Sequence, residues 1–322
     1  MARFALLFPG QGSQYVGMGQ DILAASPAAA AVFDQASQLV PAGLERLMRE
    51  GPAEQLTDTV NAQPALFLTS LACWAALDEA LGSGDSSPRP AFVAGHSLGE
   101  YSALAVARAV TFGSGLELVV ARGLAMRAAG EVQPGMMAAV LGLAADVVQA
   151  ACQEAAARSG QVVVVANDNA PGQIVISGTT AGIQAAGDLA KARGAKRVLP
   201  LAVSIAAHSP LMEPARALFA PAIARADIQA PAMPVIGNRQ AQPLVSAADV
   251  TAELDAQLIS PVRWTATIEY MVQQGISTFI EVGPKNVLAG LGKRIAPDAT
   301  FVACGTAAEV QQTARLLREQ AA

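Results

Sequence analysis

A serine between two glycines is the residue of this chain best placed for nucleophilic chemistry. Gly95-His96-Ser97-Leu98-Gly99 fits the pattern G-x-S-x-G, with an apolar run before it and a helical pattern after it. In that context the glycines allow a sharp strand-to-helix turn that presents the serine hydroxyl above the edge of a sheet. The Leu98 amide, at the start of the helix, can then donate to a developing oxyanion. A glycine turn with a chance serine is the alternative, but the flanking elements favour Ser97 as a nucleophile.

A serine hydroxyl needs a general base, and the chain has two histidines. His96 is the immediate neighbour of Ser97, so its side chain is expected to point away and to pack or hydrogen-bond beneath the turn. His208 lies between an expected strand and an expected helix, later in the chain than the serine. A histidine satisfied inside the core is the ordinary alternative, but a competent nucleophile with one available base favours His208 as that base.

The surroundings of these two residues differ from those of an ordinary serine hydrolase. No Asp or Glu between Ser97 and His208 occupies an obvious strand end, so we expect a backbone carbonyl or an amide to orient the imidazole. Arg122 lies on the second helix after the turn, where its guanidinium could bind a carboxylate through two hydrogen bonds. A solvated helix arginine is the alternative, and it is the interpretation we prefer for Arg127.

The elements that position these residues alternate between strands and helices. This alternation predicts an α/β fold with a mostly parallel sheet covered on both faces. Helices are expected at 66–81, 100–109, 116–129, 262–274 and 307–319, with another ending at Arg294, and a polar loop at 82–88. Strands are expected at 4–8, 91–94, 234–237, 277–282 and 301–304.

The segment from 131 to 199 has a different pattern. Its expected order is β-α-β-β-α-β, which is the split βαβ unit of a ferredoxin-like fold. The strands are expected at 136–143, 162–166, 173–177 and 197–203, the helices at 145–158 and 180–193, and a loop at 167–172. The segment therefore predicts a small domain at 131–199, inserted into a large catalytic domain made of 1–130 and 200–322.

Composition excludes several classes of protein. The 322 residues are 52% hydrophobic and 15% charged, which is enough apolar content for one large α/β domain or a large and a small one. The net charge is −5 and no basic run is longer than two residues, which argues against a nucleic-acid-binding protein. The three cysteines have neither metal-site nor disulfide spacing, so no metal is expected and a reducing compartment is favoured.

The apolar stretches do not predict a membrane protein. The run at 4–8 is too short for the core of a signal peptide. The uncharged stretch at 59–77 contains several polar residues, and we interpret it as a loop and a buried helix instead of a membrane span. A cytoplasmic protein is the expectation.

Seven motifs in register, covering nearly the whole chain, resemble the malonyl-CoA:acyl carrier protein transacylase family of bacterial fatty-acid synthesis and of polyketide acyltransferase domains. They are Phe8-Pro9-Gly10-Gln11-Gly12-Ser13-Gln14, Gly95-His96-Ser97-Leu98-Gly99-Glu100, Arg122 with its helix, Asn169-Ala170-Pro171-Gly172-Gln173, Ala207-His208-Ser209-Pro210, Gln257 before Ser260-Pro261-Val262-Arg263-Trp264, and Glu281-Val282-Gly283-Pro284.

The resemblance implies a ping-pong transfer of malonyl from malonyl-CoA to the phosphopantetheine thiol of acyl carrier protein, through a malonyl-serine and with no cofactor. Ser97 would attack with His208 as base, the backbone amides of Gln11 and Leu98 would form the oxyanion hole, and Arg122 would hold the malonyl carboxylate. Gln257 would line the pocket. The implied fold is an α/β-hydrolase-like core with the ferredoxin-like insertion, and the implied active site is the cleft between them.

Two features bear on the acyl group and on the partner. Ala207 stands where many malonyl-selective relatives have a bulky Phe, which leaves room beside the acyl α-carbon and makes methylmalonyl an alternative substrate. Acyl carrier protein is acidic, so docking needs a local basic patch. Two clusters are candidates, although solvated helix ends are the alternative: Lys191, Arg193, Lys196 and Arg197, and Lys285, Lys293 and Arg294.

Other functions remain open on the sequence. An acyltransferase of a polyketide synthase or of malonate decarboxylase is the nearest alternative to the enzyme of fatty-acid synthesis. A serine hydrolase such as a thioesterase is a second class, against which Arg122 and the missing triad acid count. A carrier-protein binder without activity is a third class, disfavoured by the presence of both Ser97 and His208. We expect a monomer.

Overall fold

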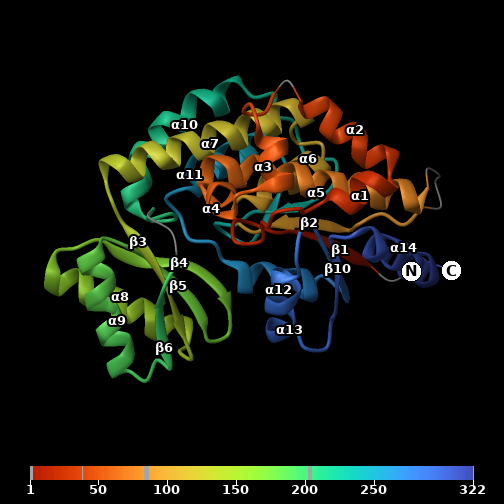
Figure 1. Ribbon diagram of the computed structural model, residues 1–322. Coiled ribbons are helices and arrows are strands. Elements are labelled where there is room, and N and C mark those ends of the chain that lie inside the picture. The colour runs from red at the N-terminus through yellow and green to blue at the C-terminus, as the bar shows by residue number, and fades with distance from the viewer. Residues whose placement is uncertain (1–2, 38, 83–86, 202–204, 322) are drawn as a thin grey trace.

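The main sheet has six strands in the order β10-β9-β1-β2-β7-β8 (Figure 1). The computed structural model describes residues 3–37, 39–82, 87–201 and 205–321. Within them only β8 runs antiparallel to its sheet neighbour, so the expected mostly parallel sheet is confirmed. The strands are β1 (Phe4–Phe8), β2 (Phe92–Gly95), β7 (Val235–Ile236), β8 (Pro243–Leu244), β9 (Thr278–Val282) and β10 (Thr300–Cys304).

Helices cover both faces of this sheet because its strands are apolar on both sides. In β1, Phe4, Leu6 and Phe8 pack into one hydrophobic cluster, while Ala5 and Leu7 pack into another. The second cluster contains α12 (Trp264–Gln273) and α13 (Val287–Ile295). The first contains α1 (Gln20–Ala25), α2 (Pro27–Ala36), α3 (Leu44–Glu50), α4 (Ala53–Thr57), α5 (Thr59–Leu81), α6 (Gly99–Val106), α7 (Phe112–Val132), α10 (Glu213–Arg225), α11 (Ala247–Gln257) and α14 (Ala307–Ala321).

Helix α5 begins earlier than the sequence predicted. The stretch expected to start as a loop is helical from Thr59, because the Asp58 side chain accepts a hydrogen bond from the Val60 amide and caps the helix. Pro64 lies within the helix. This helix is long and apolar enough to cross a membrane, but 78% of its most apolar window is buried inside the protein, as in the core helix of a globular domain.

Residues 136–200 form a second sheet with two helices packed on one face; we call them the inserted unit. The order of elements is the predicted one: β3 (Met136–Leu141), α8 (Ala145–Ser159), β4 (Val163–Ala170), β5 (Gln173–Gly178), α9 (Thr180–Ala192) and β6 (Arg197–Pro200). The strands are antiparallel in the order β4-β5-β3-β6 and have their own hydrophobic cluster. Residues 202 and 203 of the last expected strand, and 83–86 of the expected polar loop, lie outside the described residues.

Strand β4 also departs from the prediction, because residues 167–170 are strand and not loop. The register of its pairing with β5 shifts twice, and its other edge pairs with the segment before α12. The Val262 amide donates to the Ala166 carbonyl at 2.8 Å, and the Asp168 amide donates to the Val262 carbonyl at 2.9 Å. The polar residues that suggested a turn are therefore held in an edge strand, which fixes the inserted unit against the main sheet.

Candidate active site

Ser97 lies on a turn whose glycines are required by close packing. A Cβ atom on Gly95 would lie 1.9 Å from the Gly99 carbonyl carbon, and one on Gly99 would lie 2.0 Å from the Phe8 carbonyl oxygen. The turn leads directly from β2 into α6, and Ser97 has a φ of 51°, in the left-handed region. This geometry is that of a nucleophile elbow, which exposes the hydroxyl at the carboxyl end of the parallel strands.

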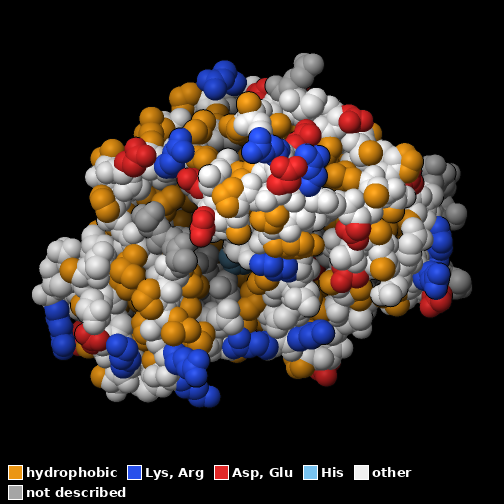
Figure 2. Space-filling view, in the orientation of Figure 1, with side chains coloured by type: hydrophobic (Ala, Val, Ile, Leu, Met, Phe, Trp, Pro, Cys, Tyr) orange, Lys and Arg blue, Asp and Glu red, His pale blue; other side chains and the backbone are white. Residues whose placement is uncertain are grey.

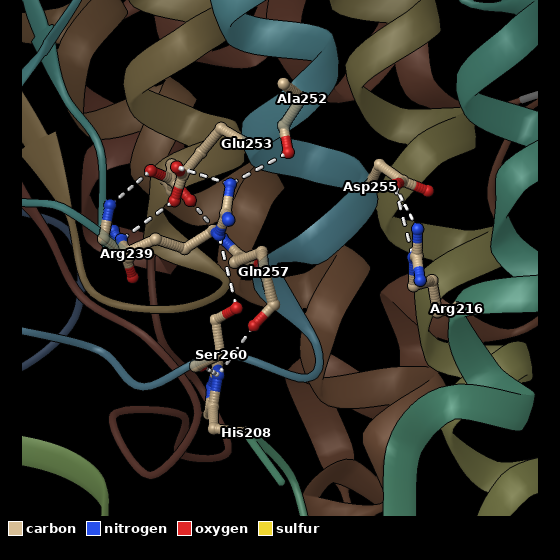
Figure 3. Close-up of polar contacts among 10 residues, drawn as sticks. His208, Arg216, Arg239, Ala252, Glu253, Asp255, Gln257 and Ser260 are labelled. Atoms are coloured by element: carbon tan, nitrogen blue, oxygen red, sulfur yellow. Dashed lines mark hydrogen bonds and ion pairs between the residues drawn. The ribbon is translucent and has the colours of Figure 1, made fainter. Parts of the chain in front are cut away.

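His208 faces the Ser97 hydroxyl from a different element. Its Nε2 atom lies 2.8 Å from Ser97 Oγ, while its Nδ1 atom lies 3.1 Å from the Gln257 carbonyl oxygen and 3.0 Å from the Ser260 carbonyl oxygen. Figure 3 shows His208 together with Gln257 and Ser260. Carbonyl oxygens only accept, so Nδ1 must carry the proton and Nε2 is left to accept from the serine. The orienting groups are thus backbone carbonyls, and sequence reasoning could not name Ser260 as one of them.

The imidazole is held neutral by its surroundings. His208 is 3% exposed, and burial, reinforced by the positive charge of Arg122, lowers its pKa from 6.5 to about 3. A neutral imidazole with a free Nε2 is the form that can take a proton from a serine.

Arg122 is buried beside Ser97. Its Nη2 atom donates to Ser97 Oγ and to Gln257 Oε1, each at 3.0 Å, and its Nη1 atom donates to Gln63 Oε1 at 2.9 Å. The guanidinium lies over the Tyr101 ring, with its carbon 5.4 Å from the ring centroid. Among the described residues no carboxylate lies within ion-pair distance of Arg122, and its Nε atom has no hydrogen-bond partner. Gln63 carried no signal in the sequence analysis.

Gln257, at the end of α11, connects the guanidinium to a buried carboxyl group. Its Nε2 atom donates to the Ser97 carbonyl at 3.1 Å and to Glu100 Oε2. Glu100 is fully buried, and this burial, together with the nearby Glu253, raises the pKa of its carboxyl well above the usual range. Glu100 belongs to a sequence motif that carried no role for it, and no pattern in the sequence predicted α11.

Asn238 is a further residue that the sequence analysis missed. It is 1% exposed, and its side chain bonds to the backbone on both sides of His96. The signal that could have found it is its place just after the strand expected at 234–237, because polar residues after parallel strands gather at one edge of the sheet.

Two backbone amides near Ser97 are available to a ligand. Within the described part of the chain, neither the Gln11 amide nor the Leu98 amide donates a hydrogen bond to the protein. The loop that carries Gln11 lies against the elbow, since a Cβ on Gly10 would be 2.4 Å from the His96 carbonyl oxygen. Leu98 is 1% exposed, and a buried amide without a partner is unusual unless a ligand uses it, whereas Gln11 is exposed.

The remaining predicted residues lie as follows. His96 Nε2 is 2.7 Å from Asn169 Oδ1 of β4, and its ring meets Trp264 edge-on, so it points away from the serine toward the inserted unit. Arg127 is exposed. Ala207 packs against a small apolar cluster on the open face of the inserted sheet, made of Met137, Ala166 and Val175.

The surface around the site carries positive charge on one side. Figure 2 shows a recess between the inserted unit and the main domain in which a histidine is visible, and Lys and Arg side chains along the lower part of this face. Lys285 donates to the Gly12 carbonyl at 3.0 Å, and Arg294 Nη1 donates to Gln173 Oε1 at 2.6 Å. Lys191 and Arg193 are paired with acidic neighbours on the inserted unit.

The part of the chain that the structure describes contains no group of three His, Cys, Asp or Glu able to hold a metal ion.

The comparisons with known proteins all match acyltransferases. The model of a family described as "Acyl transferase domain" matches residues 5–312. The malonyl CoA-acyl carrier protein transacylase of Bacillus subtilis is 41% identical over 320 residues, 99% of each chain, and that of Escherichia coli K12 is 42% identical over 93% of this chain and 95% of its own. The solved transacylase of Coxiella burnetii superposes with a TM-score of 0.93 at 40% identity, covering 98% of both chains.

A further solved structure contains a partner. It is described as a malonyl-transacylase in complex with its type II PKS acyl-carrier protein, and it superposes with a TM-score of 0.92 at 39% identity, covering 98% of this chain and all of that one.

Proposed function

This chain belongs to the malonyl CoA-acyl carrier protein transacylase family and is an acyltransferase, and we propose that it moves malonyl from malonyl-CoA to the phosphopantetheine thiol of acyl carrier protein through a malonyl-serine. The observation that carries the proposal is the position of Ser97 Oγ, 2.8 Å from His208 Nε2 and 3.0 Å from Arg122 Nη2. Nucleophile, base and a cation for the substrate carboxylate therefore meet at one atom.

In the first half-reaction Ser97 Oγ attacks the thioester carbonyl while its proton moves to His208 Nε2. The tetrahedral oxyanion is stabilised by the free amides of Gln11 and Leu98, which are the residues we assign to the oxyanion hole. The carbon–sulfur bond then breaks, the coenzyme A sulfur takes the proton from His208, and malonyl-Ser97 remains.

The second half-reaction reverses these steps with a different thiol. The pantetheine thiol of the carrier protein gives its proton to His208 and attacks the malonyl-serine carbonyl. The serine oxygen leaves and regains a proton from His208, so the enzyme returns to its starting state and the product is a malonyl thioester.

The malonyl carboxylate gives this site its selectivity in the proposal. Arg122 is a buried cation without a carboxylate partner in the described residues, and a bound malonyl group supplies one. Burial is the first cause of the low pKa of His208 and the Arg122 charge is the second, and pairing with that carboxylate neutralises the second. Binding of malonyl therefore makes the base stronger, whereas acetyl, which has no carboxylate, leaves the guanidinium unpaired and the base weak.

The rest of the proposal concerns the molecule as a whole. We assign an α/β-hydrolase-like catalytic domain to 1–130 and 200–322 and a ferredoxin-like small domain to 131–199. We place the protein in the cytoplasm as a monomer, supplying extender units for fatty-acid synthesis, with no nucleic acid or membrane as partner. Ala207 leaves room beside the acyl α-carbon, so we include methylmalonyl as a slower acyl group.

Mass spectrometry of the intact protein after brief mixing with malonyl-CoA, acetyl-CoA or methylmalonyl-CoA tests the proposal. We expect a malonyl adduct that maps to Ser97, is absent from Ser97→Ala, forms little with acetyl-CoA and disappears when phosphopantetheinylated carrier protein is added. Release of free malonate without an adduct would identify a hydrolase instead and would overturn the transfer mechanism.

A further inference from the structure

Asn238 uses every one of its polar groups at the nucleophile elbow or beside it. Its side-chain Oδ1 accepts from the Ser97 amide at 2.7 Å, and its Nδ2 donates to the Gly95 carbonyl at 2.7 Å. Its own amide donates to Glu100 Oε1 at 2.9 Å, and its carbonyl accepts from the Arg263 amide at 2.9 Å. The residue is 1% exposed, so these bonds form away from water.

The side chain of Asn238 continues the sheet beyond the end of its strand. Strands β2 and β7 pair in parallel through Val93–Val235 and Ala94–Ile236. Strand β7 ends at Ile236, and Asn238 comes two residues later, after Gly237. A carboxamide has the same donor and acceptor as a peptide group. Where the backbone of β7 leaves β2, this carboxamide takes its place and bonds to the last carbonyl of β2 and to the first amide beyond His96.

These bonds act on the conformation that aims the nucleophile. Ser97 has a φ of 51°, and a non-glycine residue in the left-handed region is costly unless its surroundings hold it there. Asn238 holds the amide of Ser97, while Gln257 Nε2 holds its carbonyl at 3.1 Å. The buried Glu100 carboxyl receives hydrogen bonds from both Asn238 and Gln257, which joins the two sides.

We propose that Asn238 is a positioning residue of the acyltransferase: its carboxamide clamps the backbone around Ser97 so that the serine hydroxyl meets His208 and Arg122. It touches no reacting atom and acts through Ser97. The inference rests on the proposed function, since it concerns the serine that function uses. It predicts that weakening the clamp slows formation of malonyl-Ser97 and leaves binding of malonyl-CoA unchanged.

Asn238→Asp tests the clamp because it removes the Nδ2 group that donates to the Gly95 carbonyl. An ionised Asp still accepts from the Ser97 amide but sets an oxygen against the Gly95 carbonyl, whereas a protonated Asp can donate to it. Burial and the facing carboxyls of Glu100 and Glu253 favour the protonated form. We therefore expect single-turnover acylation of Asn238→Asp to be about 100-fold slower than wild type at pH 8 and to recover toward wild type at pH 5.5.

The wild-type rate supplies the reference at each pH, because the pKa of His208 near 3 keeps the base neutral across this range. Asn238→Leu, of similar shape, removes both hydrogen bonds and is expected to be slow at every pH. Asn61→Asp is the matched control, since Asn61 also donates from its side chain to a backbone carbonyl, that of Gln55 at 2.9 Å, on another part of the chain. Its acylation rate is expected to equal that of wild type.

Binding is measured separately, as the Kd for malonyl-CoA in a Ser97→Ala background with and without Asn238→Asp, and is expected to be the same. A rate of Asn238→Asp that equals wild type, or that is reduced by the same factor at pH 8 and pH 5.5, would overturn the clamp. If Asn238→Leu does not fold, the pH dependence of Asn238→Asp alone decides. Failure of the wild-type protein to acylate at all would instead remove the proposed function.

Discussion

The serine hydroxyl at the centre of the site has a defined hydrogen-bond state. Ser97 Oγ accepts from Arg122 and must donate to His208, whose other nitrogen faces two carbonyl oxygens. The guanidinium of Arg122 can only donate, and the carbonyl oxygens that face His208 Nδ1 can only accept. These fixed roles leave His208 Nε2 as the acceptor for the serine hydroxyl. Burial lowers the pKa of His208, and the Arg122 guanidinium lowers it further, so in the proposed mechanism acyl selectivity and the strength of the base share one charge.

Arg122→Met is expected to remove malonyl selectivity. The variant keeps an apolar side chain of similar length but loses the charge, so acylation by malonyl-CoA should fall about 10- to 100-fold, corresponding to a lost charged hydrogen-bonding group. Acylation by acetyl-CoA should not fall, and the ratio of the two rates measures the effect. Arg127→Met, on the exposed side of the same helix, is the control and should keep the wild-type ratio. An unchanged ratio in Arg122→Met would place the carboxylate elsewhere.

The pH dependence of acylation is expected to be flat from pH 8 to about pH 5. His208 has its pKa lowered to about 3, first by burial and then by Arg122, so protonation does not remove the base in that range. In Arg122→Met the second cause is absent, and the acid limb of the rate profile should move to higher pH. A wild-type rate that halves near pH 6.5, the ordinary value for histidine, would contradict the assignment.

The same shift makes a prediction for stability. Since the pKa is lower in the folded state than in the unfolded chain, the unfolded chain takes up a proton first as the pH falls below 6.5. His208 therefore lowers the unfolding free energy as the pH falls. The loss begins near pH 6.5 and is complete near pH 3. Urea unfolding of wild type and His208→Gln at several pH values should show a shallower acid dependence for the variant.

At the scale of the elements, the site is made by the ends of strands that run in the same direction. Strands β1, β2 and β7 deliver the Gln11 loop, the Ser97 elbow and Asn238 to one edge of the sheet, because parallel strands end together. The elbow and the Gln11 loop can touch only because Gly10 and Gly99 lack side chains. Helix α7 carries Arg122 and the end of α11 carries Gln257 to the same place.

Gly99→Ala is expected to destabilise the protein and Gly290→Ala to stabilise it. The added methyl at Gly99 would meet the Phe8 carbonyl oxygen at 2.0 Å, a rigid backbone contact, and should lower the unfolding free energy by about 3 kcal/mol. At Gly290, within α13, nothing lies within 4 Å, and alanine should raise it by about 0.5–1 kcal/mol. Urea denaturation of both variants measures the difference, and equal stabilities would contradict the packing of the elbow on β1.

At the scale of the whole molecule, the site lies between the main domain and the inserted unit (Figure 2). The inserted unit is fixed along β4 by its pairing with Val262 and by the His96–Asn169 bond, and at the start of β5 by the Arg294–Gln173 bond. For the acyl-serine of the proposed mechanism, exclusion of water between these two parts would favour transfer to a thiol over hydrolysis. The net charge of −5 makes a local basic surface necessary for an acidic partner.

Charge reversal at the basic surface is expected to affect the second half-reaction. Arg197 of the inserted unit and Lys293 of α13 are exposed, and Arg197→Glu or Lys293→Glu should raise the KM for carrier protein about 10-fold at low salt, with a smaller effect at high salt. Transfer to a small neutral thiol measures the chemistry without docking and should not change. Arg315→Glu, on the exposed part of α14, makes the same charge change far along the chain and is the control. A KM unaffected in both variants would remove these clusters from the docking surface.

The sequence by itself determined the local features. Gly95, Ser97 and Gly99 specify a strand–turn–helix because few other residues permit that backbone, and the alternation of apolar segments specifies a mostly parallel sheet and the order of the inserted unit. With two histidines in the chain, His208 could be predicted as the base by elimination, and the structure places it against Ser97. The resemblance to a family added Gln11 and Gln257, which local pattern alone does not single out.

Only the tertiary structure decided which groups face one another across long separations in the chain. The carbonyl of Ser260 that orients His208, the carboxamide of Asn238 and the amide of Gln63 contribute through bonds that no local periodicity encodes. The strand at 167–170 likewise depends on Val262, because the segment becomes a strand only when an edge is offered to it. Polar contacts of this kind arise from the packing of distant elements, and for that reason they could be read from the fold and not from the sequence.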